Sequence, residues 1–420
     1  MSENVFAGGE SSIKSLEDLF HLMNRTKKAR KRIVKEYLEK GTFSAEDFNT
    51  LKEAEMKLEK IEHLGESVRL SPDENSPQGL FDISYEENEL KKDIFFLTMG
   101  EEEFKENLLL KNTEIRDEVR EALRTLEGIE FNNFISDRDG PVNNYCSRYL
   151  SSVQSVYNSV FLCRFAKTVS GNTVIVTSAP LRNGGFMDVH TMPEGEFVLA
   201  GSMGREYVNK KRQVKTYPVK KERQKKLDDL NSRIADILVQ PEYKKFSYIG
   251  SGFQQKYGQT TIARQDIAET IPEKESLEFL KVLKGVVNDI DPENKYLMID
   301  DTGMDVEIIL TVDPGGINME YNEGGETKEF TKGDGIHFLE GEIPLDLSTG
   351  PNFICGDTSS DVPMLEAALT RSEDTYTIFV TQDQELRAEI TELTDKAIFV
   401  SEPDVLVFIL NELFHSEMTD

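Results

Sequence analysis

Two aspartates one residue apart, Asp137 and Asp139, are the residues of this chain that most directly suggest chemistry. They follow the apolar pair Phe134-Ile135 and precede Gly140. If this segment is a strand, both carboxylates lie on one face, because side chains alternate with a period of two. Neighbouring carboxylates repel each other unless a cation lies between them, and Mg2+ prefers oxygen ligands. The pair therefore predicts a magnesium site.

Three further features carry polar side chains that suit the same chemistry. Thr177 and Ser178 end the run Val174-Ile-Val176, Lys332 stands in Thr331-Lys-Gly-Asp-Gly335, and Asp357 and Asp361 follow the run Phe353-Ile-Cys355. Ligand sites in open α/β sheets lie at the carboxyl ends of strands, where three of the four features are expected. Each feature alone is more often structural, as a turn residue, a helix N-cap or an exposed side chain. Their order in one chain favours a shared site.

Together the four features predict phosphoryl transfer through a covalent aspartyl phosphate. A carboxylate nucleophile divides hydrolysis into two easier steps, and phosphoryl transfer needs mainly positioning and neutralisation of charge. We expect Asp137 to attack phosphorus, and Asp139 to protonate the leaving alcohol and then activate water. Thr177 would donate its hydroxyl to a phosphoryl oxygen, and Lys332 would supply positive charge. The expected ligands of Mg2+ are Asp137, Asp357, Asp361 and the backbone carbonyl of Asp139.

Short apolar runs that alternate with helical segments predict the sheet that positions these residues. The first series runs from Phe134 to Val176 and the second from Asn352 to Leu413. This alternation is typical of βαβ units, and the runs are fully apolar because helices cover both faces of a parallel sheet. The fold class is therefore α/β, with a Rossmann-like parallel-sheet core.

Residues 183–331 interrupt this pattern. They contain a basic helical segment near 220–238 and alternating runs such as Thr260-Thr-Ile-Ala263 and Val306-Glu-Ile-Ile-Leu310. Alternating strands beside helices indicate an α+β domain. We predict that this domain is inserted between the two halves of the parallel sheet.

The first 127 residues have helical patterning and no catalytic constellation. Ser12 or Ser15 is expected to cap the first helix, Gly41 to end it and Ser44 to cap the next, with Asp47 completing a capping box. A coiled-coil-like seam is formed by Leu51, Ala54, Leu58 and Ile61. We predict a three-helix antiparallel bundle that serves as an accessory or self-association domain. The basic run at 27–35 is interpreted as a solvated helix face, or alternatively as a docking surface for an acidic partner or domain.

Composition restricts the partners of the protein. The 420 residues have a formal net charge of −28, which argues against binding to nucleic acid or to an anionic membrane. The three cysteines are far apart and odd in number, as expected for reduced thiols in a cytoplasmic protein. The first residues, Met1 to Gly9, lack the features of a signal peptide, and no apolar run approaches the ~18 residues of a membrane span.

At the four polar features the chain resembles the haloacid-dehalogenase-like phosphatase superfamily. About 155 positions separate Thr177 from Lys332, which implies the insertion known as a C2 cap, whereas the segment after Asp139 has room only for a helix and its turns. The resemblance implies a phosphatase core at 128–182 and 332–420, a C2 cap at 183–331 and an accessory domain at 1–127. A cap closes over the substrate and selects the leaving group.

Within this superfamily the chain is similar to trehalose-6-phosphate phosphatases. The similarity rests on Leu199-Ala-Gly-Ser-Met-Gly-Arg-Glu206, on Val306-Glu307 followed by Lys332-Gly333, and on Gly356-Asp-Thr-Ser-Ser-Asp361. Met203 stands where histidine is usual, and Pro141 stands where threonine is usual. The helical extension and the phrase Asn143-Asn-Tyr-Cys-Ser-Arg-Tyr149 resemble the nematode-type branch of the family.

Binding of a disaccharide needs polar side chains that converge from the cap. The candidates are Lys256, Arg264 and Glu307 in the cap, together with Ser178 in the core. Glu307 is expected on the sheet face opposite to Val306 and Ile308. The alternative is that Glu307 faces solvent and that the glutamine-rich segment 252–259 is a polar surface loop.

These observations predict a Mg2+-dependent phosphoric monoester hydrolase that converts trehalose 6-phosphate to trehalose and phosphate. Other C2-capped phosphatases, acting on sucrose 6-phosphate, a glucosyl or mannosyl phosphoglycerate or a phosphoinositol-like ester, remain alternatives. So do a phosphotransferase or mutase, and a non-catalytic scaffold that acts through the helical N-terminus.

Overall fold

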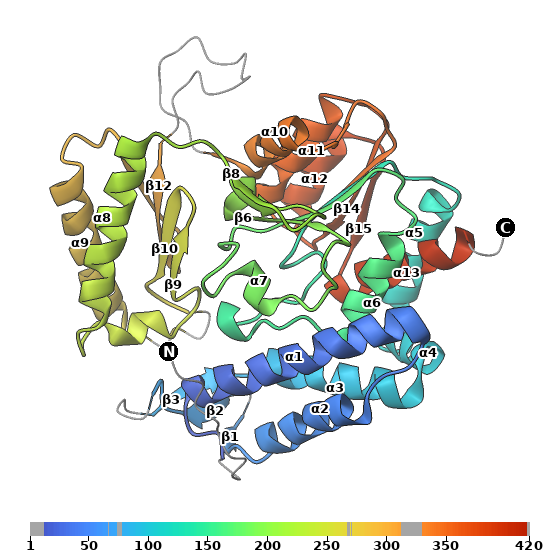
Figure 1. Cartoon of the computed structure of the whole chain (residues 1–420), viewed down its shortest axis with the longest axis horizontal. Coiled ribbons are helices and arrows are strands. Elements are labelled where there is room, and N and C mark those ends of the chain that lie inside the picture. Colours follow the sequence, from blue (N-terminus) through green and yellow to red (C-terminus); the bar gives the residue numbers. More distant parts are fainter. Residues whose placement is uncertain are drawn as a thin grey trace.

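The computed structural model describes residues 12–65, 67–73, 78–266, 269, 271–311 and 330–417. These residues form an eight-stranded, a four-stranded and a three-stranded sheet, with helices packed around them (Figure 1). The expectation about a signal peptide falls on residues outside this description. Among the described helices, none is long and apolar enough to cross a membrane.

The eight-stranded sheet is the centre of the molecule, and its strand order is β15-β14-β13-β4-β5-β6-β7-β8. The strands from β15 to β6 are parallel, and β7 and β8 extend the sheet as antiparallel strands. Their bounds are β4 Asn133–Asp137, β5 Asn172–Val176, β6 Val198–Gly201, β7 Glu206–Val208, β8 Val214–Thr216, β13 Asn352–Gly356, β14 Thr375–Val380 and β15 Ala397–Val400. The α/β class with a parallel core is therefore confirmed.

Helices cover both faces of this sheet, which explains why β4, β5 and β13 are buried along their whole length. One layer contains α6 (Val156–Phe165) and α13 (Pro403–Glu417). The other layer contains α10 (Lys332–Glu342), α11 (Val362–Leu369) and α12 (Gln384–Leu393) (Figure 1). Because β4, β5 and β13 are neighbouring parallel strands, their carboxyl ends lie at one edge of the sheet.

The inserted domain has a four-stranded antiparallel sheet in the order β11-β12-β10-β9. Its strands are β9 Phe253–Lys256, β10 Gln259–Ala263, β11 Leu297–Asp301 and β12 Asp305–Leu310, and its two long helices are α8 Lys221–Leu238 and α9 Glu273–Ile290. The helices cover one face and share an apolar core with Val306 and Ile308. The opposite face of the sheet is turned toward the eight-stranded sheet and its helices (Figure 1).

The predicted start of the cap at residue 183 is wrong, because strands β6, β7 and β8 come after this residue and still belong to the main sheet. Strand β6 pairs with β5 in parallel, and β7 and β8 continue from β6. The reason is visible in Phe197-Val-Leu-Ala-Gly201, an apolar run whose residues are all buried. The chain therefore leaves the main sheet after β8.

The N-terminal region contains α1 Leu16–Lys40, α2 Ala45–Leu58, α3 Ser84–Met99, α4 Glu101–Leu110 and α5 Thr113–Leu126. Ser15 caps α1 in a capping box with Asp18, and Gly41 ends it in a left-handed conformation. Ser44 caps α2, whereas Asp47 binds Arg32 of α1 instead of completing a box. The helical expectation is confirmed, with more helices than the predicted bundle of three.

A small sheet between α2 and α3 was not predicted. It is formed by β1 His63–Leu64, β2 Ser67–Leu70 and β3 Gly79–Asp82. Val68, Leu70 and Phe81 are its buried side chains. Strands of two to four residues carry too little alternation to be distinguished from a loop in the sequence.

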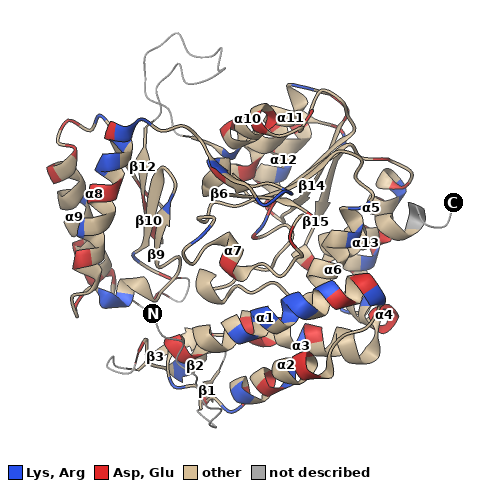
Figure 2. Cartoon of the chain, viewed as in Figure 1, with Lys and Arg blue, Asp and Glu red and all other residues tan. Residues whose placement is uncertain are grey.

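The basic run of α1 joins this helix to the rest of the molecule (Figure 2). Arg30 is buried, with its Nε 2.5 Å from Oδ2 of Asp93 in α3 and its Nη1 3.0 Å from the carbonyl oxygen of Val153. Lys27 Nζ donates to the carbonyl of Met187, and Lys31 pairs with Glu194. Docking onto a neighbouring part of the chain is thus the correct interpretation for these residues, while Lys28 and Lys35 are exposed.

Candidate active site

The carboxyl edge of the parallel sheet brings the predicted catalytic residues together. Asp137 is the last residue of β4, Thr177 follows β5, and Asp357 follows β13. Lys332 begins α10, whose N-cap Thr331 forms a capping box with Asp334. The Lys332 ammonium lies 2.9 Å from Oδ1 of Asp137. Residues separated by up to 220 positions thus meet at one edge.

Three buried carboxylates form a group that could hold a metal ion. Ligand atoms of Asp137, Asp357 and Asp361 all lie within 4.8 Å of one another. Asp361 is held by the backbone N–H groups of Asp357 and Thr358, and its Oδ1 lies 2.5 Å from the ammonium of Lys332. Such a group is unfavourable because three carboxylates share the positive charge of the Lys332 ammonium.

The pKa values of Asp137 and Asp357 are raised by burial and by the repulsion between the carboxylates. Burial raises the pKa of Asp137 to about 7, Lys332 opposes the change and Asp361 adds to it. Burial, and then the charges of Asp361 and Asp137, raise the pKa of Asp357 to about 9. Oδ1 of Asp357 is buried without a hydrogen-bond partner among the described residues. A hard divalent cation with oxygen ligands therefore fits this group.

Asp139 has a different environment from Asp137. Its Oδ1 accepts hydrogen bonds from Nη1 of Arg138 at 2.5 Å and from Nδ2 of Asn143 at 3.3 Å. Its side chain lines the cavity described below, to one side of the carboxylate group. The contribution of its backbone carbonyl to a metal site stays a prediction.

Gly140 allows the loop after β4 to approach the acidic group closely. Its φ is +105°, and a Cβ at this position would lie 2.1 Å from Oδ2 of Asp357. A side chain here would collide with a candidate metal ligand. Only glycine fits both this backbone conformation and this contact.

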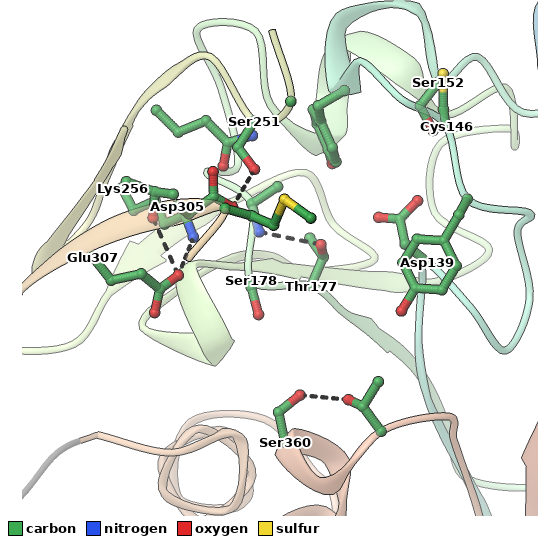
Figure 3. A pocket seen from close by; sticks show the side chains of 18 of the residues that line it. Asp139, Cys146, Ser152, Thr177, Ser178, Ser251, Lys256, Asp305, Glu307 and Ser360 are labelled. Carbon is green, nitrogen blue, oxygen red and sulfur yellow. Dashed lines mark hydrogen bonds and ion pairs between the residues drawn. The ribbon is translucent and has the colours of Figure 1, made fainter. Parts of the chain in front are cut away.

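A cavity of about 380 Å3 lies between the main-sheet edge and the cap. Asp137, Asp139, Thr177, Ser178 and Lys332 line it from the core, and Lys256, Glu307, Gln254 and Asp305 line it from the cap. Figure 3 shows Thr177 and Ser178 between the cap side chains and Asp139. The cavity is therefore bounded by both domains.

Alternation along the cap strands places Lys256 and Glu307 in this cavity. Val306 and Ile308 belong to the apolar core under α8 and α9, whereas Glu307 lines the cavity on the other face. Nζ of Lys256 lies 3.6 Å from Oε1 of Glu307 (Figure 3). Burial lowers the pKa of Lys256, and the charge of Glu307 opposes this change. Lys256 is buried and Glu307 is partly exposed, so polar groups of a ligand in the cavity could contact the pair.

Arg264 is the predicted binding residue that the structure does not bring to the site. Its Nε lies 2.7 Å from Oδ1 of Asp301, and its Nη1 donates to Ser276 of α9 at 2.7 Å. The described lining of the cavity does not include it. Arg264 directly follows β10 and its side chain reaches toward α9, so its contacts indicate a role in packing the cap.

Tyr145 is a site residue that the sequence reasoning missed. Its hydroxyl donates to Oδ2 of Asp357 at 2.6 Å, while most of the side chain is exposed in the cavity. Its position in the loop after Asp139 was the available signal, but a tyrosine in a polar loop has no distinctive pattern. The contact depends on how this loop folds back over the end of β13.

The stretch Leu199–Glu206 joins β6 to β7 within the main sheet and contacts the cap. Ser202 donates to Glu206 at 2.7 Å and accepts a hydrogen bond from the backbone N–H of Tyr257 in the cap. Ser202 and Met203 both have positive φ values, 53° and 60°. Ser202 thus joins this turn to the loop between β9 and β10 of the cap.

The fold and the site together define a class of protein. A catalytic-type aspartate ends a central parallel strand, and an α+β domain inserted between Thr177 and Lys332 covers that edge. This is the arrangement of haloacid-dehalogenase-like phosphatases with a C2 cap.

Comparison with known families narrows this class. The model for the C-terminal domain of trehalose-6-phosphate phosphatase matches residues 134–406, and the model for its N-terminal helical bundle domain matches residues 15–115. The chain therefore belongs to the trehalose-6-phosphate phosphatase family.

Individual relatives include two kinds of protein. Alpha,alpha-trehalose-phosphate synthase (UDP-forming) 1 of Aphelenchoides avenae is 32% identical over 95% of this chain and 36% of its own length. Trehalose-phosphatase of Brugia malayi is 26% identical over 96% of this chain and 87% of its own length. A solved trehalose-6-phosphate phosphatase related protein is 14% identical, covering 68% of this chain and 99% of its own, with a TM-score of 0.45. The chain thus spans about a third of the synthase that it matches.

Proposed function

We propose that this chain hydrolyses trehalose 6-phosphate to trehalose and inorganic phosphate. The observation that carries the proposal is the contact of Lys332 with Asp137 and Asp361 beneath a cavity shared with the cap. Family membership and the name of the Brugia malayi relative support the choice of substrate.

Asp137 is the nucleophile in this proposal. Its carboxylate attacks phosphorus, the bond from phosphorus to the sugar oxygen breaks, and Asp139 gives its proton to that oxygen. Water then attacks the aspartyl phosphate while Asp139 takes its proton, which releases phosphate and restores Asp137. Thr177 and Lys332 hold the phosphoryl oxygens and balance their charge.

We also propose that Asp137, Asp357 and Asp361 hold Mg2+. When bound, the ion would neutralise the carboxylates and the transferring phosphoryl group. Oδ1 of Asp357 is the buried oxygen that the ion would satisfy.

The sugar is assigned to the cap side of the cavity. Lys256 and Glu307 would form hydrogen bonds with sugar hydroxyls, with Ser178 contributing from the core. Cap closure over this face would exclude water while the leaving group departs.

The test is phosphate release by the purified chain with Mg2+, followed by addition of EDTA. Trehalose 6-phosphate is compared with sucrose 6-phosphate, a glucosyl phosphoglycerate and a phosphoinositol. We expect preferential release from trehalose 6-phosphate, loss of release with EDTA, and loss of turnover in Asp137→Asn with an unchanged unfolding midpoint.

Other outcomes identify the alternatives. Preference for another ester changes the substrate within the same class, and transfer to a sugar acceptor indicates a phosphotransferase. Activity retained by Asp137→Asn refutes the mechanism. Absence of release from every ester indicates a scaffold.

A further inference from the structure

Helix α3 places buried polar side chains against the loop that follows Asp139. Tyr85, Glu86 and Glu89 are each less than 8% exposed, although they belong to the helical N-terminal region. Their partners lie in residues 143–148, about 60 positions later in the chain. A buried polar face on a helix requires partners, and here the partners belong to the loop from which Tyr145, Cys146 and Ser147 line the cavity.

The shortest connection runs from Tyr85 through Asn143 to Asp139. The Tyr85 hydroxyl can donate a hydrogen bond to Oδ1 of Asn143 at 3.1 Å or to the carbonyl oxygen of Val153 at 3.2 Å. Nδ2 of Asn143 donates to Oδ1 of Asp139 at 3.3 Å. The backbone of Asn143 is also tied to this turn, because its carbonyl accepts from the N–H of Gly140.

The contacts at the two ends of the Asn143 amide determine which way it faces. An asparagine amide has an acceptor end and a donor end, and a rotation of 180° exchanges them. Nδ2 donates to the carbonyl oxygen of Asn144 at 2.8 Å, and Oδ1 faces the Tyr85 hydroxyl. Both contacts favour the orientation in which Nδ2 also faces the Asp139 carboxylate. In the opposite orientation the amide oxygen would face that carboxylate and repel it.

The other end of the loop is fixed by the same helix. Arg148 is buried, with Nη2 3.0 Å from Oε1 of Glu86 and a further hydrogen bond to the carbonyl of Asp82. Asn144 donates to Oε1 of Glu89 at 3.3 Å and to Asp404 of α13 at 2.8 Å. The loop is therefore held at both ends by side chains from outside the α/β core.

We propose that α3 is a positioning element of the phosphatase site, in which Tyr85 acts through Asn143 to orient Asp139 for proton transfer to the leaving alcohol. This inference rests on the proposed function, because it assigns the N-terminal region a role in that reaction. Tyr85 and Asn143 are positioning residues, since both act through Asp139 and neither lines the cavity that would hold the phosphate ester.

The proposal predicts an effect that depends on the leaving group. A sugar alkoxide is strongly basic and needs a proton from Asp139 as it departs, whereas p-nitrophenolate departs without one. Misorientation of Asp139 should therefore affect trehalose 6-phosphate more than p-nitrophenyl phosphate. A general loss of structure would affect both substrates alike.

The experiment measures kcat/KM for both substrates with the full chain and the variants Tyr85→Phe and Asn143→Ala. For trehalose 6-phosphate we expect a decrease of about fivefold to tenfold, the scale of one lost hydrogen bond. For p-nitrophenyl phosphate we expect a change of less than about twofold. The two variants together keep the test informative if one of them is unstable.

Asp93→Asn is the matched control on the same helix. Asp93 contacts Arg30 and the N–H of Val156 and does not contact Asn143. This variant should lower the unfolding midpoint, and any change in kcat/KM should be the same for the two substrates. Equal losses on both substrates in Tyr85→Phe and Asn143→Ala, or no loss at all, would overturn the proposal. An inactive wild-type chain would instead refute the proposed function.

Discussion

At the scale of single residues, equivalent side chains acquire different roles from their surroundings. Asp137 is buried beside Lys332 and two more carboxylates, whereas Asp139 faces the cavity with Arg138 and Asn143. The local sequence predicted both positions because they follow an apolar run. It could not show which groups from elsewhere in the chain surround each carboxylate.

Replacement of Glu307 tests the cap side of the cavity. Glu307→Gln keeps the size of the side chain but removes the charge that pairs with Lys256. We expect kcat/KM for trehalose 6-phosphate to fall about tenfold or more, since charged hydrogen bonds contribute about 1.5–3 kcal/mol. Hydrolysis of a small aryl phosphate should change little, because that substrate does not reach the cap strands.

Asp300→Asn is the control for this variant. Asp300 is the cross-strand neighbour of Glu307 in β11, and it is exposed and outside the described lining of the cavity. It should leave both activities unchanged. Equal losses on the two substrates in Glu307→Gln would remove Glu307 from the sugar site.

Tyr145 provides a prediction about metal binding. Its hydroxyl holds Oδ2 of Asp357, which leaves Oδ1 toward the carboxylate group. Groups that orient metal ligands typically contribute about 10–100-fold to affinity, so Tyr145→Phe should weaken Mg2+ binding at least about tenfold. Calorimetric titration without substrate measures this, with Tyr376→Phe on β14 as the control. Unchanged affinity in Tyr145→Phe would contradict the assignment.

At the scale of elements, helix α1 sets the electrostatic environment of the segment after α7 (Phe186–Val189). Lys27 binds the carbonyl of Met187, and His190 is buried at the end of α7. Burial lowers the pKa of His190 to about 3, and the charges of Lys31 and Lys27 add to this effect. The histidine is therefore neutral in the folded chain.

This burial predicts a loss of stability in mild acid. An unfolded histidine takes up a proton near pH 6.5, but folded His190 does so only near pH 3. Its contribution is complete above pH 6.5 and is lost as the pH falls toward 3. Between pH 7 and pH 5, the free energy of unfolding should decrease by about 2 kcal/mol more in the wild type than in His190→Gln.

Denaturant unfolding at the two pH values measures this difference. The comparison between variants cancels the titration of the many carboxylates that both chains share. A wild type and a variant with the same pH dependence would show that His190 is accessible to protons in the folded state.

Predictability from sequence also differed between elements. Strands β4, β5 and β13 were predictable because each contains a short apolar run with a polar residue at its end or directly after it. The placement of Arg264 was not, because its partner Ser276 lies in a helix whose packing on the cap sheet has no local signal. The pairing of β6 with β5 was likewise invisible, since strand order is a property of the sheet.

At the scale of the whole molecule, the N-terminal helices and the α/β core share one apolar interior. Phe96 and Phe104 pack against Phe161 and Tyr157 of α6, and the same cluster continues to α13. The sequence predicted the helices but not this continuity, because helical periodicity shows that a face is buried without showing what buries it.

Removal of residues 1–127 tests whether the α/β core can fold without the apolar interior that it shares with the N-terminal helices. The remaining chain would expose the apolar side chains of α6 and α13 that these helices cover. We expect the truncated chain to aggregate or to lack a cooperative unfolding transition, because large exposed apolar patches favour association. Circular dichroism and size-exclusion chromatography measure this, and a monomeric, cooperatively folded product would contradict it.

The contacts of α3 with residues 143–148 also matter for protein engineering. A chimera that joins the N-terminal helices of one relative to the phosphatase core of another, cut near residue 127, would divide a single hydrogen-bond network between two parents. Tyr85, Glu86 and Glu89 would come from one parent, while Asn143, Asn144 and Arg148 came from the other. A segment that is exchanged between relatives should therefore extend from the N-terminal helices through Val153, so that α3 is transferred together with the loop that it supports.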